Sequence, residues 1–152
     1  MSVSYIWLYL TAVISILTLF LVPFDKIKEL FGFSLIGGFL LAVVVQLAGI
    51  SLGWWSFNSG FLIFYNFPLG VAFMWLPAVI TFAYFFNKTG TLTGKIMIIF
   101  IWSFITSLIT YASVEFGYRN YIDWNIYYDF ILAIFLHSVL GYYLFIKRKR
   151  EV

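Results

Sequence analysis

The chain contains no cysteine and a single histidine among its 152 residues. The lack of cysteine excludes disulfides, thiolate nucleophiles and Cys-ligated zinc or iron–sulfur sites. A single histidine argues against a His-based metal site, and the sequence contains neither a nucleotide-binding loop nor the pattern of a catalytic triad. We therefore expect no metal and no cofactor.

Charge is also scarce: 10% of the residues are charged, 64% are hydrophobic, and the mean hydropathy is +1.02. Soluble domains carry about 25% charged and about 45–50% apolar residues. The net charge is +3, but the basic residues fall in separate short segments and form no continuous face for a phosphate backbone. The composition therefore places the chain in a lipid bilayer and argues against a nucleic-acid partner.

Long apolar runs make up most of the chain. A membrane-spanning helix needs about 20 mostly apolar residues. Five such runs alternate with polar segments, at 4–22, 33–53, 67–86, 95–114 and 125–146. No soluble tail or linker remains between them. The predicted fold is all-α, a single membrane domain over residues 1–152 that forms a polytopic bundle of five transmembrane helices.

Lysine and arginine occur in every second polar segment. Lys26 and Lys28 follow the first run, Lys88 and Lys95 separate the third from the fourth, and the chain ends in "KRKREV". The segment after the second run is uncharged, and the one after the fourth has one arginine beside acids. Because positive residues stay on the cytoplasmic side, we expect the N-terminus outside and the C-terminus in the cytoplasm. The first run, with no charge ahead of it, is predicted to be a retained span and not a signal peptide.

The segment "EFGYRNYIDWN", residues 115–125, holds most of the charge outside the lysine-rich segments. Glu115, Arg119 and Asp123 are four residues apart, and Asp129 follows. If the fourth helix continues for one turn, Glu115 pairs with Arg119, and a compact turn would let Arg119 meet Asp123. A solvated loop ion pair, worth about 0–1 kcal/mol, is an equal alternative for Arg119 and Asp123. Glu115 and Asp129 lie at or inside the apolar boundary, where a carboxylate costs about 2.5–3.5 kcal/mol at full depth and needs a partner, a proton or water.

Two polar side chains lie within the spans. His137 follows Asp129 by about 12 Å of helical rise and about 80° of rotation, so both can border one inward-facing cavity. An alternative for His137 is a neutral imidazole bonded to a neighbouring helix. Gln46 lies in the outer half of the second run. We expect an outward-opening cavity lined by Gln46, Glu115, Asp129 and His137, with Arg119 as the counter-charge of Glu115 and His137 as an inner proton relay.

Small and aromatic residues predict further contacts. Gly38, Ala42, Gly49 and Gly53 recur along the second run, with a G-x-x-x-G at 49–53, which is typical of tight helix packing in membranes. Aromatic residues near the outer ends of the runs indicate an interfacial belt. They are Trp54, Trp55, Tyr65, Tyr118, Tyr121 and Trp124.

The C-terminal half combines a glutamate ending the fourth helix, a glycine, an aromatic residue, a Trp-Asn pair and a histidine in the last helix. These are Glu115, Gly117, Tyr121, Trp124, Asn125 and His137. In this pattern, and in "WWSF" and Pro77, the last two-thirds of the chain resembles a functionally uncharacterised family of small five-helix integral membrane proteins of spore-forming Gram-positive bacteria. The resemblance implies a multi-pass protein of a bacterial cytoplasmic membrane, with no activity attached. A weaker likeness, in the acid, arginine, aspartate and asparagine before the last helix, is to the VanZ-like antibiotic-resistance proteins.

Three functions stay open at this point. The first, which we prefer, is binding or transport of a small or amphiphilic ligand, with the carboxylates and the histidine accepting protons as it binds. The second is an accessory or assembly subunit whose glycine faces dock a membrane protein partner or another copy of the chain. The third is an enzyme acting on a lipid or isoprenoid with Glu115 and Asp129 as acid and base, although no nucleophile or metal pattern accompanies them.

Overall fold

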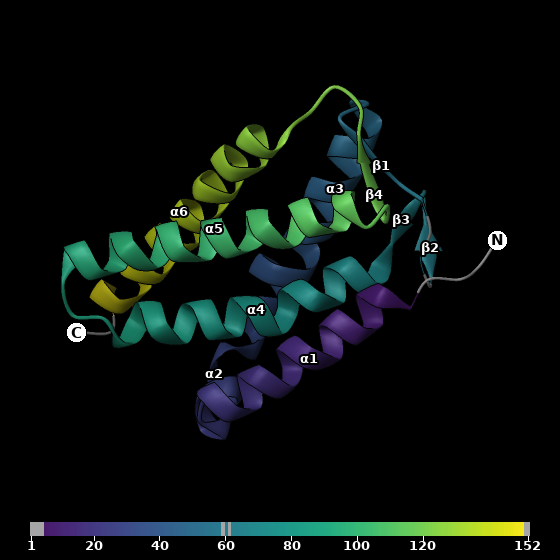
Figure 1. The fold of residues 1–152 in the computed structure, drawn as a ribbon. Helices are drawn as coiled ribbons and strands as arrows, with labels where there is room; N and C mark the ends of the chain where they lie inside the picture. Colours follow the sequence, from purple (N-terminus) through teal and green to yellow (C-terminus); the bar gives the residue numbers. More distant parts are fainter. Residues whose placement is uncertain (1–4, 59, 61, 151–152) are drawn as a thin grey trace.

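The computed structural model describes residues 5–58, 60 and 62–150, with the side chains as far as Lys147. The predicted start of the first span at Ser4 and the last two residues of the C-terminal tail lie outside this range. The helices are α1 (Ile6–Leu21), α2 (Phe24–Ser34), the π-helix η1 (Leu35–Leu40), α3 (Leu41–Ser51), α4 (Leu69–Lys88), α5 (Leu92–Glu115) and α6 (Ile126–Arg150) (Figure 1). Short strands are β1 (Trp55–Phe57), β2 (Ile63–Phe64), β3 (Phe67–Pro68) and β4 (Arg119–Tyr121).

The described part of the chain confirms an all-α fold with five helical stretches. Because α2, η1 and α3 run on without a break, they form one helix of 28 residues, and this helix, α4, α5 and α6 are long and apolar enough to cross a membrane. The apolar α1 has 16 residues, which gives a length of about 24 Å against a hydrocarbon thickness of about 30 Å. The chain is therefore a multi-pass membrane protein by the length and composition of its helices.

The second helix begins earlier than the sequence indicates. We expected a loop around Lys26 and Lys28 and a helix from 33, but α2 starts at Phe24, directly after Pro23. Asp25 in its first turn complements the positive helix end. Lys26 Nζ lies 2.7 Å from Glu29 Oε2, one turn on. The lysines thus belong to the first turns of a spanning helix.

Two helices end in the same way, and this determines where the strands lie. Gly53 after α3 and Gly117 after α5 both have a φ of 73°. In each case the N–H of the next residue bonds the carbonyl oxygen five residues earlier, at 2.9 Å after α3 and 2.8 Å after α5. This Schellman arrangement needs a left-handed residue, which glycine adopts without strain. It turns the chain into β1 and β4, which pair antiparallel with Phe57 opposite Arg119.

Helix α4 contacts every other helix of the described chain, and α5 and α6 form a second close pair. α1 packs mainly on α4, and α5 packs mainly on α6. The Thr18 hydroxyl on α1 donates to the Pro77 carbonyl oxygen on α4 at 3.1 Å. All four strands gather at one end of the bundle, where α1 begins and α5 ends, whereas the α4–α5 connection and the end of α6 lie at the opposite end (Figure 1). We refer to these as the strand end and the lysine end.

Candidate functional site

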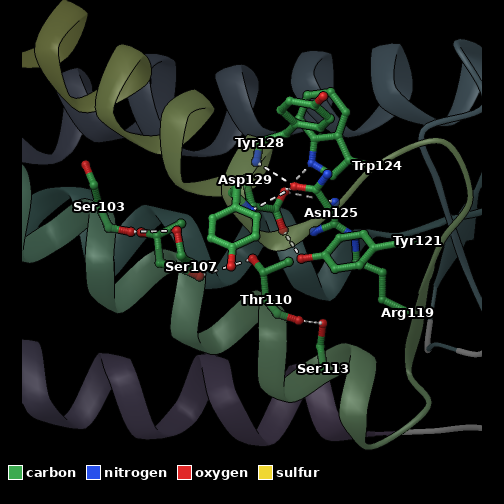
Figure 2. Close-up of polar contacts among 12 residues, drawn as sticks. Ser103, Ser107, Thr110, Ser113, Arg119, Tyr121, Trp124, Asn125, Tyr128 and Asp129 are labelled. Carbon is green, nitrogen blue, oxygen red and sulfur yellow. Dashed lines mark hydrogen bonds and ion pairs between the residues drawn. The ribbon is translucent and has the colours of Figure 1, made fainter.

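A buried ion pair lies at the strand end. Arg119 on β4 is 5% exposed and Asp129 in the first turn of α6 is 7% exposed. One guanidinium nitrogen lies 3.5 Å from Asp129 Oδ1. The same carboxylate accepts hydrogen bonds from the Tyr121 hydroxyl and, at 2.8 Å, from Trp124 Nε1. Figure 2 shows these donors converging on Asp129 from the segment before α6.

Aromatic rings surround the guanidinium of Arg119. Its central carbon lies 4.2 Å from the ring centre of Trp55, 5.5 Å from that of Tyr121 and 5.8 Å from that of Phe57. These three rings, the aromatic cage, add cation–π attraction to the ion pair. Burial lowers the pKa of Arg119, and the charge of Asp129 offsets only part of this lowering. An arginine nevertheless remains a cation in proteins. Burial, followed by the hydrogen bond to Asp129, raises the pKa of Tyr121, which keeps its phenol a neutral donor.

Two adjoining cavities meet at Arg119. The larger, of about 60 Å³, lies between α1, α4 and α5, and the smaller, of about 30 Å³, lies between α3, α5 and α6. A cavity needs about 10–15 Å³ to hold a water-sized group, so both admit polar atoms of a ligand. Five residues line both cavities: Gln46, Trp75, Thr106, Thr110 and Arg119.

The larger cavity is long and narrow. It follows α5 from Ser113 to Trp102, which corresponds to about 16 Å along the helix axis. Arg119 and Ser113 provide its charged end, and the wall farther along combines apolar side chains such as Ile14 and Val79 with the buried His137. The cavity thus offers a charged end and a mostly apolar wall to a small amphiphile.

Buried polar atoms around these cavities are left unpaired. Among the described residues, Nε1 of Trp7, Nε1 of Trp55, Nε of Arg119 and Oε1 of Gln46 have no hydrogen-bond partner. More than 90% of buried polar groups in proteins are paired, and leaving one unpaired costs about 1–3 kcal/mol. Three of these atoms are donors and one is an acceptor. The walls are therefore suited to a group that mainly accepts hydrogen bonds.

Glu115 does not take part in this arrangement, which corrects the expected pairing. It is the last residue of α5, it is exposed, and it interacts with the Tyr111 hydroxyl one turn earlier. The glycine turn at Gly117 ends the helix before a further turn can bring Glu115 and Arg119 together. Asp123 is exposed as well, and the carboxylate partner of Arg119 is Asp129.

His137 and Asp129 border different cavities. His137 is 1% exposed and lines the larger cavity, whereas Asp129 lines the smaller one. The Nδ1 atom of His137 lies 2.8 Å from the carbonyl oxygen of Ala133. Because a carbonyl oxygen only accepts, Nδ1 carries the proton, and Ser103 Oγ lies 3.3 Å from it. The single cavity expected from the sequence is thus divided in two, with Gln46 and Arg119 in both walls.

The glycines of the second span have different surroundings. A Cβ on Gly38 would lie 2.9 Å from the carbonyl oxygen of Trp75, so α4 approaches closely there, and Ala42 is buried in the same region. A Cβ on Gly49 would lie 1.9 Å from Trp55 Cζ2. Gly53 lies beyond the helix, where a Cβ would meet no described atom within 4 Å. Within the chain, the 49–53 motif thus accommodates a tryptophan and a turn, and docking of a partner on this face stays a prediction.

Three residues that contact the ion pair are not identified as such from the sequence. The sequence indicates an interfacial belt for Trp55, Tyr121 and Trp124, whereas in the structure their polar atoms or rings contact Arg119 or Asp129. The position of Asp129 could have indicated these contacts, because a carboxylate inside the apolar boundary requires hydrogen-bond donors. The tyrosine eight residues before Asp129 and the tryptophan five residues before it provide them.

No protein-family model, curated protein or solved structure matches this chain.

Proposed function

We propose that the chain binds a small amphiphile whose acidic head, a carboxylate or phosphate, contacts Arg119 and whose apolar part extends between α4 and α5. The observation that carries this proposal is a buried arginine at the polar end of a narrow cavity, with an Nε that has no partner among the described residues. A guanidinium presents several N–H groups in a planar fork that matches carboxylate and phosphate oxygens. Arg119 is thus both the positive charge and the principal donor of the proposed site.

The other groups around Arg119 support the same ligand chemistry. Asp129 already accepts from Tyr121 and Trp124, and its contact with Arg119 is long at 3.5 Å. Asp129 therefore offsets part of the buried charge while the edge of the guanidinium with Nε remains available. Trp7 lines the larger cavity and Trp55 the smaller one, and the unpaired indole N–H of each adds a donor beside Arg119.

Two variants test this proposal without removing the buried charge. Arg119→Lys keeps a cation beside Asp129 but lacks the fork, and a hydrogen bond to a charged group contributes about 1.5–3 kcal/mol, so retention of the ligand should fall by at least about tenfold. Gln46→Met keeps the shape of the side chain and removes both its unpaired oxygen and the amide N–H groups that can donate to the acidic head, so folding should be unaffected while retention falls about fivefold. The measurement is native mass spectrometry of the protein released from native membrane patches.

Glu115→Gln is the matched control, because Glu115 is exposed and lines neither cavity. It should retain the same small-molecule mass as the wild type. If all four proteins carry the same mass equally, the ligand lies elsewhere. If none carries a small molecule and all carry one partner subunit, the accessory role replaces the proposal.

We also infer that the strand end faces the outside of the cell and the lysine end the cytoplasm. The exposed lysines of the described chain, Lys26, Lys28, Lys88 and Lys147, all belong to segments of the lysine end. Positive residues in short loops are retained in the cytoplasm. The candidate ligand would then enter from the outer side.

The absence of cysteine allows a direct test of this orientation. Asp123→Cys and Lys28→Cys each place one thiol at an exposed position, at the strand end and the lysine end respectively. In intact cells, a membrane-impermeant maleimide should label Asp123→Cys, whereas Lys28→Cys should react only after permeabilisation. The reverse pattern would show the opposite orientation.

A further inference from the structure

A second and larger recess lies at the lysine end, away from the cavities at Arg119. It is a groove of about 580 Å³ between the α2–η1 segment and α6. Phe33 and Ile36 line one side, Val139 and Tyr143 line the other, and the buried Leu140 lies in its floor. This volume falls in the range of small-molecule pockets, about 300–1,000 Å³. The groove is thus large enough for a lipid chain or a comparable apolar segment.

The charged residues that line this groove are one lysine and one carboxylate, and two further lysines line a recess beside it. Lys147 lines the groove on α6, and Glu29 lines it on α2. The Glu29 carboxylate lies 2.7 Å from Lys26 Nζ, which neutralises it. An adjoining recess of about 330 Å³ shares Glu29 and is also lined by Lys26 and Lys88. Three lysines and one carboxylate therefore border these two recesses, which share Glu29, Leu30 and Asn87 in their walls.

The backbone leaves room on one side of the groove. A Cβ on Gly32, which lines it, would meet no described atom within 4 Å. One turn later the π-helix η1 begins, where each turn holds more residues than in an α-helix. Toward the floor of the groove the contacts are tight, since a Cβ on Gly37, which also lines the groove, would lie 2.7 Å from Leu140 Cδ2.

We infer that this groove binds one anionic phospholipid, with the phosphate near Lys147 and an acyl chain along Phe33, Ile36 and Val139. The charge of the groove favours this occupant. Anionic lipids of the cytoplasmic leaflet are attracted to basic residues beside membrane helices, and an apolar floor next to lysines suits a chain attached to a phosphate. A second copy of the chain in the same membrane would place its own lysines at the same depth, where like charges repel. The inference is independent of the site at Arg119.

Lipid binding is tested with phosphatidylglycerol and phosphatidylcholine of identical acyl chains, titrated onto the delipidated protein and followed by native mass spectrometry. The wild type should retain phosphatidylglycerol in preference to phosphatidylcholine. Gly32→Leu should fold normally, because it replaces glycine in a helix with a strong helix former in open space. Its side chain occupies the groove, so phosphatidylglycerol binding should fall at least about fivefold. Lys147→Gln should reduce the preference for the anionic lipid about fivefold.

Two matched variants lie at the same end of the molecule but outside the groove. Gly90→Leu also adds a side chain where no described atom lies within 4 Å, and Lys28→Gln also removes an exposed charge. Both should bind phosphatidylglycerol as the wild type does. Equal binding of the two lipids by the wild type, or unchanged binding by Gly32→Leu, would overturn the inference. A dimer in the wild type that Gly32→Leu dissociates would also overturn it, because the groove would then hold a second copy.

Discussion

Replacing Asp129 with alanine is expected to destabilise the folded chain by about 3–5 kcal/mol, the effect of removing one partner from a buried ion pair. Arg119 is 5% exposed and would remain buried without its carboxylate. The Tyr121 hydroxyl and Trp124 Nε1 would lose their acceptor in the same step. The free energy of unfolding in mixed detergent micelles measures this loss.

The exposed Asp123 provides a matched control for this prediction. Asp123→Ala removes a carboxylate from the same connection and should change stability by less than about 0.5 kcal/mol. The double variant Arg119→Met with Asp129→Leu should recover part of the loss, because an apolar pair of similar volume replaces a buried ion pair at little cost. An effect of Asp129→Ala no larger than that of Asp123→Ala would contradict the burial of this pair.

The sequence predicts the bundle well because each span is a long apolar run. Four of the five predicted runs correspond to the helices that are long and apolar enough to span a membrane, and the boundaries of α5 differ by three residues at the start and one at the end. The start of α2 was missed for a physical reason. A helix turn that carries lysines at the membrane boundary has the composition of a loop, and only two residues, Val22 and Pro23, separate it from α1.

The site was predicted only in part, because its geometry depends on two turns. Arg119, Asp129, His137 and Gln46 all line the cavities as polar residues within an apolar chain. Their pairing is determined by the turn at Gly117, which converts an expected helical continuation into β4. A four-residue spacing implies an ion pair only if the helix continues. The glycine is visible in the sequence. The pairing of β4 with β1 is not, because it joins segments that are far apart along the chain.

Gly49→Ala is expected to destabilise the chain by about 1–3 kcal/mol or more, as overpacking of a tight core does. A Cβ at this position would lie 1.9 Å from Trp55 Cζ2 and 2.3 Å from Trp55 Cε2. Trp55 is 1% exposed, stacks on Arg119 and packs edge-on against Trp124 at 5.4 Å. The indole therefore has to leave its position, and with it one ring of the aromatic cage.

The direction of the change in unfolding free energy distinguishes an effect of packing from an effect of helix propensity. Alanine in place of glycine within a helix normally stabilises by up to about 1 kcal/mol, and Gly32→Ala should do so, since its Cβ would meet no described atom within 4 Å. Unfolding free energies of the two variants should thus change in opposite directions. Trp55→Phe, which removes the ring atoms nearest to residue 49, should recover part of the loss in the Gly49→Ala background. If Gly49→Ala instead stabilises the chain as Gly32→Ala does, then Trp55 does not lie over Gly49, and the aromatic cage around Arg119 is assembled differently.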